Sequence, residues 1–222
     1  MSSTFSDELL QSIMPIYRKI QRHPFVKEFT LGRLDNELFK FYLNQYLLFL
    51  KEYSRGLSIL AAKAPSLTNT STLTAHAKLM AMTEKELIKG FLANFKVKIK
   101  DAYKTQMIPI VSFYTSHLLQ SAYRGTFAEG LAAFLPRYLS YYEVAKTLSI
   151  KSSTTKTYQK WINSYTHPKY VEMVGDMIAI TNQTTKFLSV GEKNRLSSIS
   201  FTTARLEYMF WDDIYKRQTW PV

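Results

Sequence analysis

One stretch of this chain restricts its fold more than any other. Residues 38–50 read Leu-Phe-Lys-Phe-Tyr-Leu-Asn-Gln-Tyr-Leu-Leu-Phe-Leu, within a segment that Asp35 can cap as a helix and that Pro65 follows. Apolar side chains cover nearly every face of such a helix, and a helix of that kind belongs in the middle of a bundle. The sequence therefore predicts an all-α fold in which other helices surround this one.

The other segments with helical periodicity supply the surrounding helices. Ser66 to Thr74 is rich in serine and threonine, so we expect a loop and a helix cap there. Pro136 lies inside a helix, where it removes the backbone bond to Ala132 and predicts a kink. Helices are expected over residues 7–22, 35–64, 75–95, 107–124, 127–147, 157–165, 169–183 and 189–216, with connections at 98–104 and 151–156.

Nothing in the pattern separates two cores. The chain shows no convincing strand, no repeat and no long linker, so we predict one domain, residues 1–222, folded as a multi-helix bundle. It has no run of eighteen uncharged apolar residues, which argues against a membrane span. The N-terminus lacks the features of a signal peptide and the chain has no cysteine, and both observations favour a cytoplasmic location.

The composition excludes several classes of partner and cofactor. The formal net charge is +12, but the basic residues are scattered and form no recognition motif, so we predict no nucleic-acid partner. Seven glycines provide no phosphate-binding loop. We therefore predict neither a metal nor a cofactor. The four histidines lack the spacing of paired metal ligands and are interpreted as surface or capping residues: His23, His76, His117 and His167.

Glu207 is an acidic residue placed where a helix should show apolar side chains. It lies beside a stripe that includes Thr203 and Phe210, one turn before Trp211. Held against aromatic rings, the carboxylate would lose water, its pKa would rise, and it could exchange protons near neutral pH. A glutamate at the edge of the stripe that reaches solvent or pairs with Arg205 fits the same spacing and is the commoner arrangement.

Aromatic residues are numerous, with 15 tyrosines and 14 phenylalanines. Core packing accounts for many of them, but the hydroxyl groups of buried tyrosines need hydrogen-bond partners. Several tyrosines that converge with Gln45, Arg137 and Glu207 could line a slot for a flat, polar heterocycle.

Short motifs follow one another along the chain in a recognisable order: HPFV at 23–26, LGRL at 31–34, FKFYLNQ at 39–45, YTSHLL at 114–119, LAAFLP at 131–136, YYE at 141–143, YQKWI at 158–162 and EYMFWD at 207–212. No single motif is decisive, but their order and spacing hold from about residue 5 to 217. In this arrangement the chain resembles the TenA family, which are thiaminase II-type aminopyrimidine hydrolases with a haem-oxygenase-like helical fold.

The resemblance implies antiparallel helices around one central pocket, usually in a homotetramer, and a small-molecule substrate derived from thiamin. It implies that Glu207 moves protons while water replaces the exocyclic amine of an aminopyrimidine, or the thiazolium of thiamin. Tyr114, Tyr141 and Tyr165 match pocket residues that contact the ring or the nucleophile. Phe49 matches an aromatic wall against which the ring stacks.

Two positions depart from the family pattern. The usual nucleophilic cysteine follows the Leu-Pro pair, where this chain has Arg137, and the usual aspartate follows Gln45, where it has Tyr46. An arginine cannot attack carbon as a thiolate does, and a tyrosine cannot give the charge-assisted pairing of a carboxylate. Arg137 either snorkels outward to a neighbouring subunit or enters the pocket and forms a salt bridge with Glu207.

Two functions remain open at this point. The first is a cysteine-free hydrolase of aminopyrimidines or thiamin, with Glu207 as general acid/base and water as the nucleophile. The alternative is a binding protein without this activity, whose pocket, recast by Arg137 and Tyr46, holds a different heterocycle or an anion.

Overall fold

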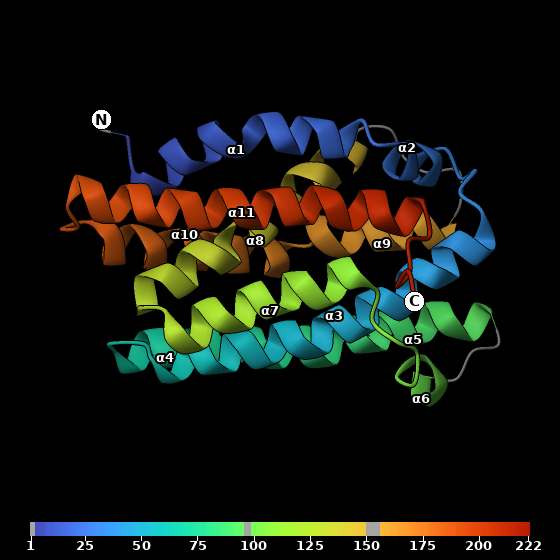
Figure 1. Cartoon of the computed structure of the whole chain (residues 1–222), viewed down its shortest axis with the longest axis horizontal. Coiled ribbons are helices and arrows are strands. Elements are labelled where there is room, and N and C mark those ends of the chain that lie inside the picture. The colour runs from blue at the N-terminus through green and yellow to red at the C-terminus, as the bar shows by residue number, and fades with distance from the viewer. Residues whose placement is uncertain (1–2, 96–98, 150–155) are drawn as a thin grey trace.

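The all-α prediction is confirmed by a computed structural model, which describes residues 3–95, 99–149 and 156–222 and has no strand within those ranges. Within them, no helix is long and apolar enough to cross a membrane. The elements are α1 Phe5–Gln21, α2 Pro24–Thr30, α3 Asn36–Ala62, α4 Leu67–Leu79, the π-helical η1 Met80–Glu84, α5 Lys85–Asn94, α6 Ile99–Ala102, α7 Pro109–Arg124, α8 Phe127–Ser149, α9 Lys156–Thr166, α10 Pro168–Thr185 and α11 Val190–Tyr215 (Figure 1).

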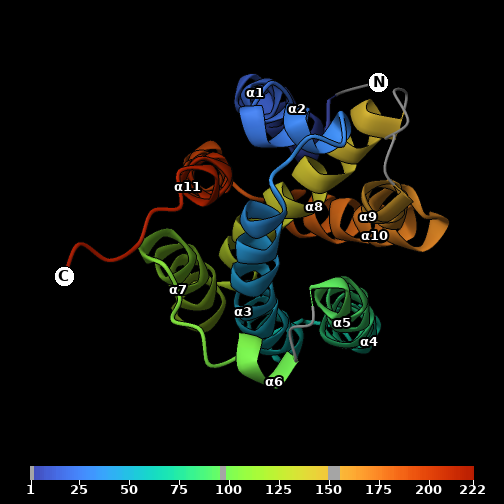
Figure 2. The same cartoon turned by 90° about the vertical axis from the view of Figure 1, so that its right-hand side faces the viewer.

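Two helices, α3 and α8, form the interior of the bundle. Seen end-on, the pair α1 and α2, the helices α11 and α7, the pair α4 and α5, and the pair α9 and α10 are arranged around them (Figure 2). The α3 helix packs against α4, α7 and α8, while α8 packs against α11, α10, α9 and α7. This central position agrees with the apolar surface of residues 38–50, most of which are buried.

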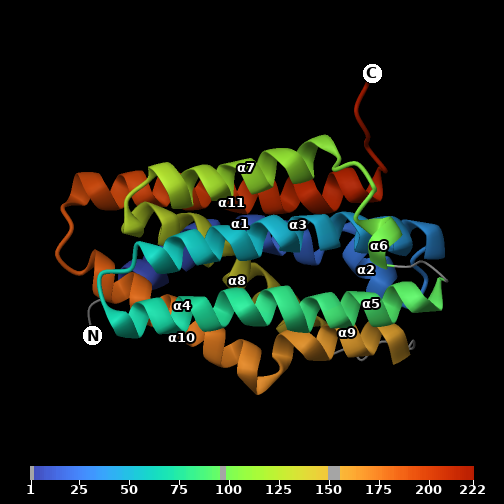
Figure 3. The ribbon, with the colours of Figure 1, turned by 90° about the horizontal axis from the view of Figure 1, so that it is seen from below.

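The prediction of a loop and a helix cap from Ser66 to Thr74 is correct only for the cap, Ser66. Ser66 is the N-cap of α4, where its hydroxyl accepts from the backbone N–H of Asn69, and the serines and threonines that follow are helical. Leu73 is buried against the bundle core, and tertiary packing of this kind outweighs weak helix propensity. The helices α4, η1 and α5 then continue along the molecule nearly end to end (Figure 3).

Of the two connections predicted further along the chain, the structure describes most of one and little of the other. The connection at 98–104 contains the short helix α6, and most of the connection at 151–156 lies outside the described residues. The other predicted helices are present, with ends that differ by a few residues.

Near Pro136, hydroxyl groups of α11 bind backbone carbonyls of α8. The helix continues through the proline, which cannot donate a backbone bond to the Ala132 carbonyl. The Ser200 hydroxyl of α11 donates to that carbonyl at 2.6 Å, and the Thr203 hydroxyl donates to the next carbonyl, of Ala133, at 3.0 Å. The proline therefore leaves an acceptor, the Ala132 carbonyl, that holds α11 at Ser200, about two turns before Glu207.

We predict that Ser200→Ala lowers the free energy of unfolding by about 1–3 kcal/mol, because the buried Ala132 carbonyl then loses its partner. The measurement is urea denaturation followed by circular dichroism. Ser197→Ala is the matched control, since the Ser197 hydroxyl donates within its own helix to the Lys193 carbonyl. Equal stability of the two variants would show that Ser200 contributes nothing specific to the packing of α8 on α11.

Candidate active site

The α11 helix places Glu207 in the interior, with 2% of its surface exposed. One carboxylate oxygen, Oε2, accepts from the Tyr114 hydroxyl at 2.8 Å, and the other, Oε1, accepts from the Trp211 indole N–H at 3.1 Å. Of the two arrangements considered from the sequence, the buried one is therefore found, whereas Arg205 is exposed. Trp211 reaches the carboxylate because residues four positions apart lie on the same helix face.

The surroundings of Glu207 act on its protonation in opposite directions. Burial raises the pKa of the carboxyl group, since loss of water penalises the charged form. The positive charge of Arg137 and the hydrogen bonds from Tyr114 and Trp211 stabilise the carboxylate and limit the rise in its pKa. Burial and the Glu207 charge raise the pKa of Tyr114 well above its usual value, so Tyr114 stays protonated and donates. This balance suits a group that both accepts and releases a proton.

Arg137 points into the bundle, which excludes the outward alternative. Only 1% of its surface is exposed, and Nη2 donates to the Tyr46 hydroxyl at 2.5 Å. The guanidinium carbon lies 4.2 Å from the ring centre of Tyr141 and 4.7 Å from that of Tyr53, both within cation–π range. The second alternative is found in part, because Arg137 enters the bundle but the ion pairs among the described residues do not include one between Arg137 and Glu207. The arginine therefore influences the acid through space.

Tyr46 connects this cation to a second tyrosine. A guanidinium can only donate, so the Tyr46 oxygen accepts from Arg137, and it lies 2.6 Å from the Tyr165 hydroxyl oxygen. The Tyr46 ring also stacks on Tyr141, with 6.0 Å between ring centres. The two positions that depart from the family pattern, 46 and 137, are thus hydrogen-bonded to each other.

Phe49 joins the two halves of the cluster. Its ring centre lies 4.9 Å from that of Tyr114, which binds Glu207, and 5.0 Å from the guanidinium carbon of Arg137. The structure therefore brings together seven of the eight site residues named from the sequence. They are Tyr46, Phe49, Tyr114, Arg137, Tyr141, Tyr165 and Glu207.

Gln45 is engaged elsewhere. Its Nε2 donates to the Gln106 carbonyl at 2.9 Å, and its Oε1 accepts from the Ile108 backbone N–H at 3.1 Å. Both ends of the side-chain amide therefore hold the segment that leads into α7, the helix of Tyr114. The sequence carries no local signal for this contact, because its partners lie about sixty positions along the chain.

The sequence places Trp211 beside Glu207, and the structure adds that its indole N–H donates to the carboxylate. One aromatic residue near Arg137 was not identified from the sequence. Tyr53, which contacts Arg137, lies one helical turn after Phe49. The interpretation of His76 as a surface or capping residue is wrong, because only 3% of it is exposed.

Two of the other three histidines cap helices, and the third binds a threonine hydroxyl. His23 and His167 cap α2 and α10, as predicted, and His117 is half-buried, with its Nε2 2.9 Å from the Thr203 hydroxyl. In the ranges that the structure describes, no three His, Asp or Glu side chains lie close enough together to hold a metal ion.

Known proteins match this chain over nearly its whole length. The model of the TENA/THI-4/PQQC family matches residues 10–217. An aminopyrimidine aminohydrolase from Halalkalibacterium halodurans is 29% identical over 219 residues, which cover 98% of each chain.

Solved structures share the architecture. A TenA homologue from P. horikoshii OT3 has a TM-score of 0.89 and 29% identity, over 96% of this chain and 99% of the other. A Shewanella denitrificans domain with a heme oxygenase-like fold has a TM-score of 0.73 at 15% identity, over 95% of this chain and 91% of the other. The predicted haem-oxygenase-like fold is confirmed.

We predict that Arg137→Met moves the protonation midpoint of Glu207 upward, because loss of the positive charge disfavours the carboxylate. Trp211 fluorescence can follow the titration in a background in which Trp161 and Trp220 are replaced by phenylalanine, since Trp211 donates to Glu207. Arg205→Met is the control, because it removes the same charge from an exposed position two residues away. An unchanged midpoint in Arg137→Met would contradict the through-space role of Arg137.

Proposed function

The chain belongs to the TENA/THI-4/PQQC family, and from this we propose that it is a hydrolase of thiamin metabolism that replaces the amine of an aminopyrimidine by water. The observation that carries the proposal is the buried Glu207 carboxylate, held by Tyr114 and Trp211 inside an aromatic cluster. The name of the Halalkalibacterium halodurans relative supports the same reaction, and it favours hydrolysis over a binding protein without activity.

The aromatic cluster suits the substrate in shape and polarity. A pyrimidine ring is flat, so it can stack on the ring of Phe49, while the hydroxyl groups of Tyr114, Tyr141 and Tyr165 offer hydrogen bonds to its polar edge. Arg137 and Tyr46, which are hydrogen-bonded to each other, would face the ring edge and offer it a guanidinium or a hydroxyl group. Stacking would orient the ring, and the polar groups would fix its rotation.

Glu207 would move the protons. In the protonated form it donates to the leaving amine as the carbon–nitrogen bond breaks. As a carboxylate it then takes a proton from the water whose oxygen forms the new bond to carbon, and this step restores the acid. Tyr114 and Trp211 hold both oxygens in place during the exchange, and the nearby charge of Arg137 keeps the carboxylate form accessible.

Water is the nucleophile because no thiolate is available. The chain has no cysteine, and the guanidinium of Arg137 stays protonated and cannot attack carbon. Thiamin is a second proposed substrate, as in a thiaminase II. Its thiazole leaves as a neutral ring, so Glu207 would act there only as a base toward water.

The proposal includes a homotetramer that works in the cytoplasm. Large apolar side chains remain exposed on the monomer, among them Phe113 at 61%, Tyr123 at 75% and Phe187 at 87%. Contact between subunits would bury such side chains.

We predict that Glu207→Gln lowers kcat for aminomethyl-aminopyrimidine by roughly a hundredfold or more, since the amide neither gives nor takes a proton. Release of ammonia is the measurement. Glu143→Gln is the matched control, because Glu143 is a half-buried glutamate that makes no contact with the cluster among the described hydrogen bonds and ion pairs. Wild-type protein that releases no more ammonia than Glu207→Gln would remove the proposed activity.

We predict a particle mass close to four times the 25.8 kDa of one chain in light scattering after size-exclusion chromatography. Burial of exposed apolar side chains would provide the driving force. A mass of one chain at micromolar concentration would contradict the tetramer and leave the proposed reaction untouched.

A further inference from the structure

Arg137 places a permanent positive charge inside the aromatic cluster. Its guanidinium carbon lies close to four ring centres, which belong to Tyr141 (4.2 Å), Tyr53 (4.7 Å), Phe49 (5.0 Å) and Tyr46 (5.4 Å). An arginine stays protonated throughout the physiological pH range. Only 1% of its surface is exposed, so salt screens this charge much less than a charge on the surface.

The same rings include those on which a flat ligand is proposed to stack. The face of an aromatic ring is electron-rich and attracts a cation at such distances. In this cluster the guanidinium already makes that interaction with Phe49 and Tyr141, so a second cation would gain less from the two rings and would be repelled by the first. An uncharged ring can stack there without this repulsion.

The repulsion is large enough to decide which ligands bind. A ligand ring whose centre stands about 4.5 Å from that of Phe49 lies within roughly 10 Å of the guanidinium carbon, because Phe49 itself is 5.0 Å from that carbon. With an effective dielectric constant of about 20, two unit charges at this separation repel each other enough to weaken binding by roughly tenfold or more.

Glu207 is the group in the cluster that could offset the charge of Arg137. Its carboxylate form attracts a cation, but the proposed removal of the amine begins with Glu207 protonated, as the acid that donates to the leaving group. An ammonium group already holds the proton that Glu207 would supply, whereas a neutral amine can accept it. Selection of the neutral amine by Arg137 and proton donation by Glu207 therefore require the same form of the substrate.

We propose that Arg137 is a specificity-determining residue, which makes the site select uncharged pyrimidines and disfavour ligands with a positive charge on the ring or on the amine. The inference rests on the proposed function for the place where the ligand binds. It makes the neutral form of the aminopyrimidine the form that binds. It also makes thiamin, whose thiazolium is a permanent cation, the poorer of the two proposed substrates.

Binding of two probes tests this selection without any turnover. The neutral probe is the hydroxymethyl-aminopyrimidine that the proposed reaction would form, used above the pKa of its ring nitrogen, and the cationic probe is its N-methylated pyrimidinium salt. Both are titrated by calorimetry into Glu207→Gln, whose amide imitates the protonated acid. We expect the neutral probe to bind more tightly, and we expect Arg137→Met, added to this parent, to lower the ratio of the two affinities by roughly tenfold or more. The steric effect of the methyl group is common to both proteins and cancels.

A further substitution separates the charge of Arg137 from its hydrogen bond. The amide of Arg137→Gln can still donate to the Tyr46 hydroxyl, which now accepts from Nη2 at 2.5 Å. If the charge selects the ligand, Arg137→Gln should show the ratio of Arg137→Met, whereas a structural role would weaken both probes alike. Arg205→Met is the matched control, because it removes an exposed arginine and should keep the ratio of the parent.

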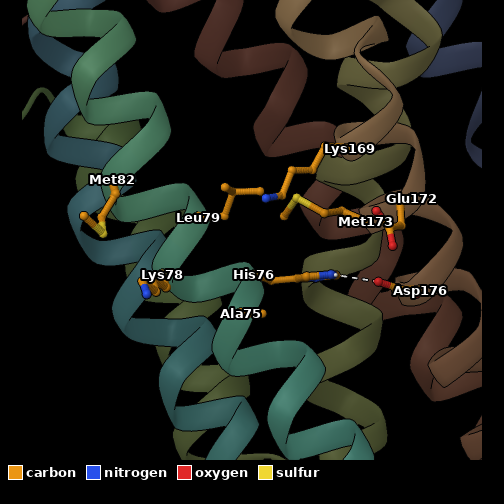
Figure 4. A pocket seen from close by; sticks show the side chains of 9 residues that line it. All are labelled: Ala75, His76, Lys78, Leu79, Met82, Lys169, Glu172, Met173 and Asp176. Carbon is orange, nitrogen blue, oxygen red and sulfur yellow. Dashed lines mark hydrogen bonds and ion pairs between the residues drawn. The ribbon is translucent and has the colours of Figure 1, made fainter.

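The pocket between α4 and α10 is a second place where the cationic probe could bind (Figure 4). Its volume is about 460 Å³, and its lining includes the acidic side chains of Glu172 and Asp176. Asp176 lies 3.2 Å from Nε2 of the buried His76, so Glu172→Gln removes a charge from the pocket without breaking that pair. The titrations are therefore repeated with Glu172→Gln added to each protein, and the effect of Arg137→Met on the ratio should persist.

The outcomes distinguish this selection from the proposed reaction. An affinity ratio that Arg137→Met leaves unchanged, or an effect that disappears with Glu172→Gln, would overturn the selection, as would failure of the neutral probe to bind. Wild-type protein that releases no ammonia, in a series that shows the expected ratios, would instead count against the hydrolysis and leave the selection by charge standing.

Discussion

The burial of a single carboxylate, Glu207, is the constraint around which the rest of the structure is organised. An isolated carboxylate in an apolar interior is strongly unfavourable, so the fold must supply donors and positive charge. Two donors come from α7 and α11, through Tyr114 and Trp211, and the positive charge comes from α8 through Arg137. Because the arginine is held by aromatic ring faces and not by the acid itself, the carboxylate remains free to gain and lose a proton.

Tyr46 and Arg137, the two departures from the family pattern named above, are chemically linked, because one accepts a hydrogen bond from the other. The cluster already holds one carboxylate and one guanidinium, so its formal charges balance. An aspartate at position 46 would add a second buried carboxylate, whereas the Tyr46 hydroxyl satisfies the guanidinium without adding charge. Relative to the pattern that the resemblance implies, a cation and a neutral acceptor stand in place of a nucleophile and an acid, and Glu207 is the acid of the cluster.

Much of the fold could be predicted from sequence, because burial of one helix face imposes a periodicity on each helix. The pattern failed from residue 67 to 74, where burial of Leu73 against the rest of the bundle outweighs local propensity. For the site, motif order identified the positions that now form the cluster. It could not predict where Arg137 points or what Gln45 binds, since both depend on side chains from helices distant in sequence.

The hydrogen bonds between α11 and the backbone of α8 near Pro136 determine which part of the fold can vary in sequence. The two carbonyls there take hydroxyl groups from Ser200 and Thr203, so the axial position of Glu207 is fixed by the neighbouring helix and not by the connection that precedes α11. A slip of α11 by one residue would break both bonds and leave the Ala132 carbonyl, which lies four residues before Pro136 and has no backbone donor there, without its partner. The loop between α10 and α11 can therefore change in length and composition during evolution while the acid keeps its place.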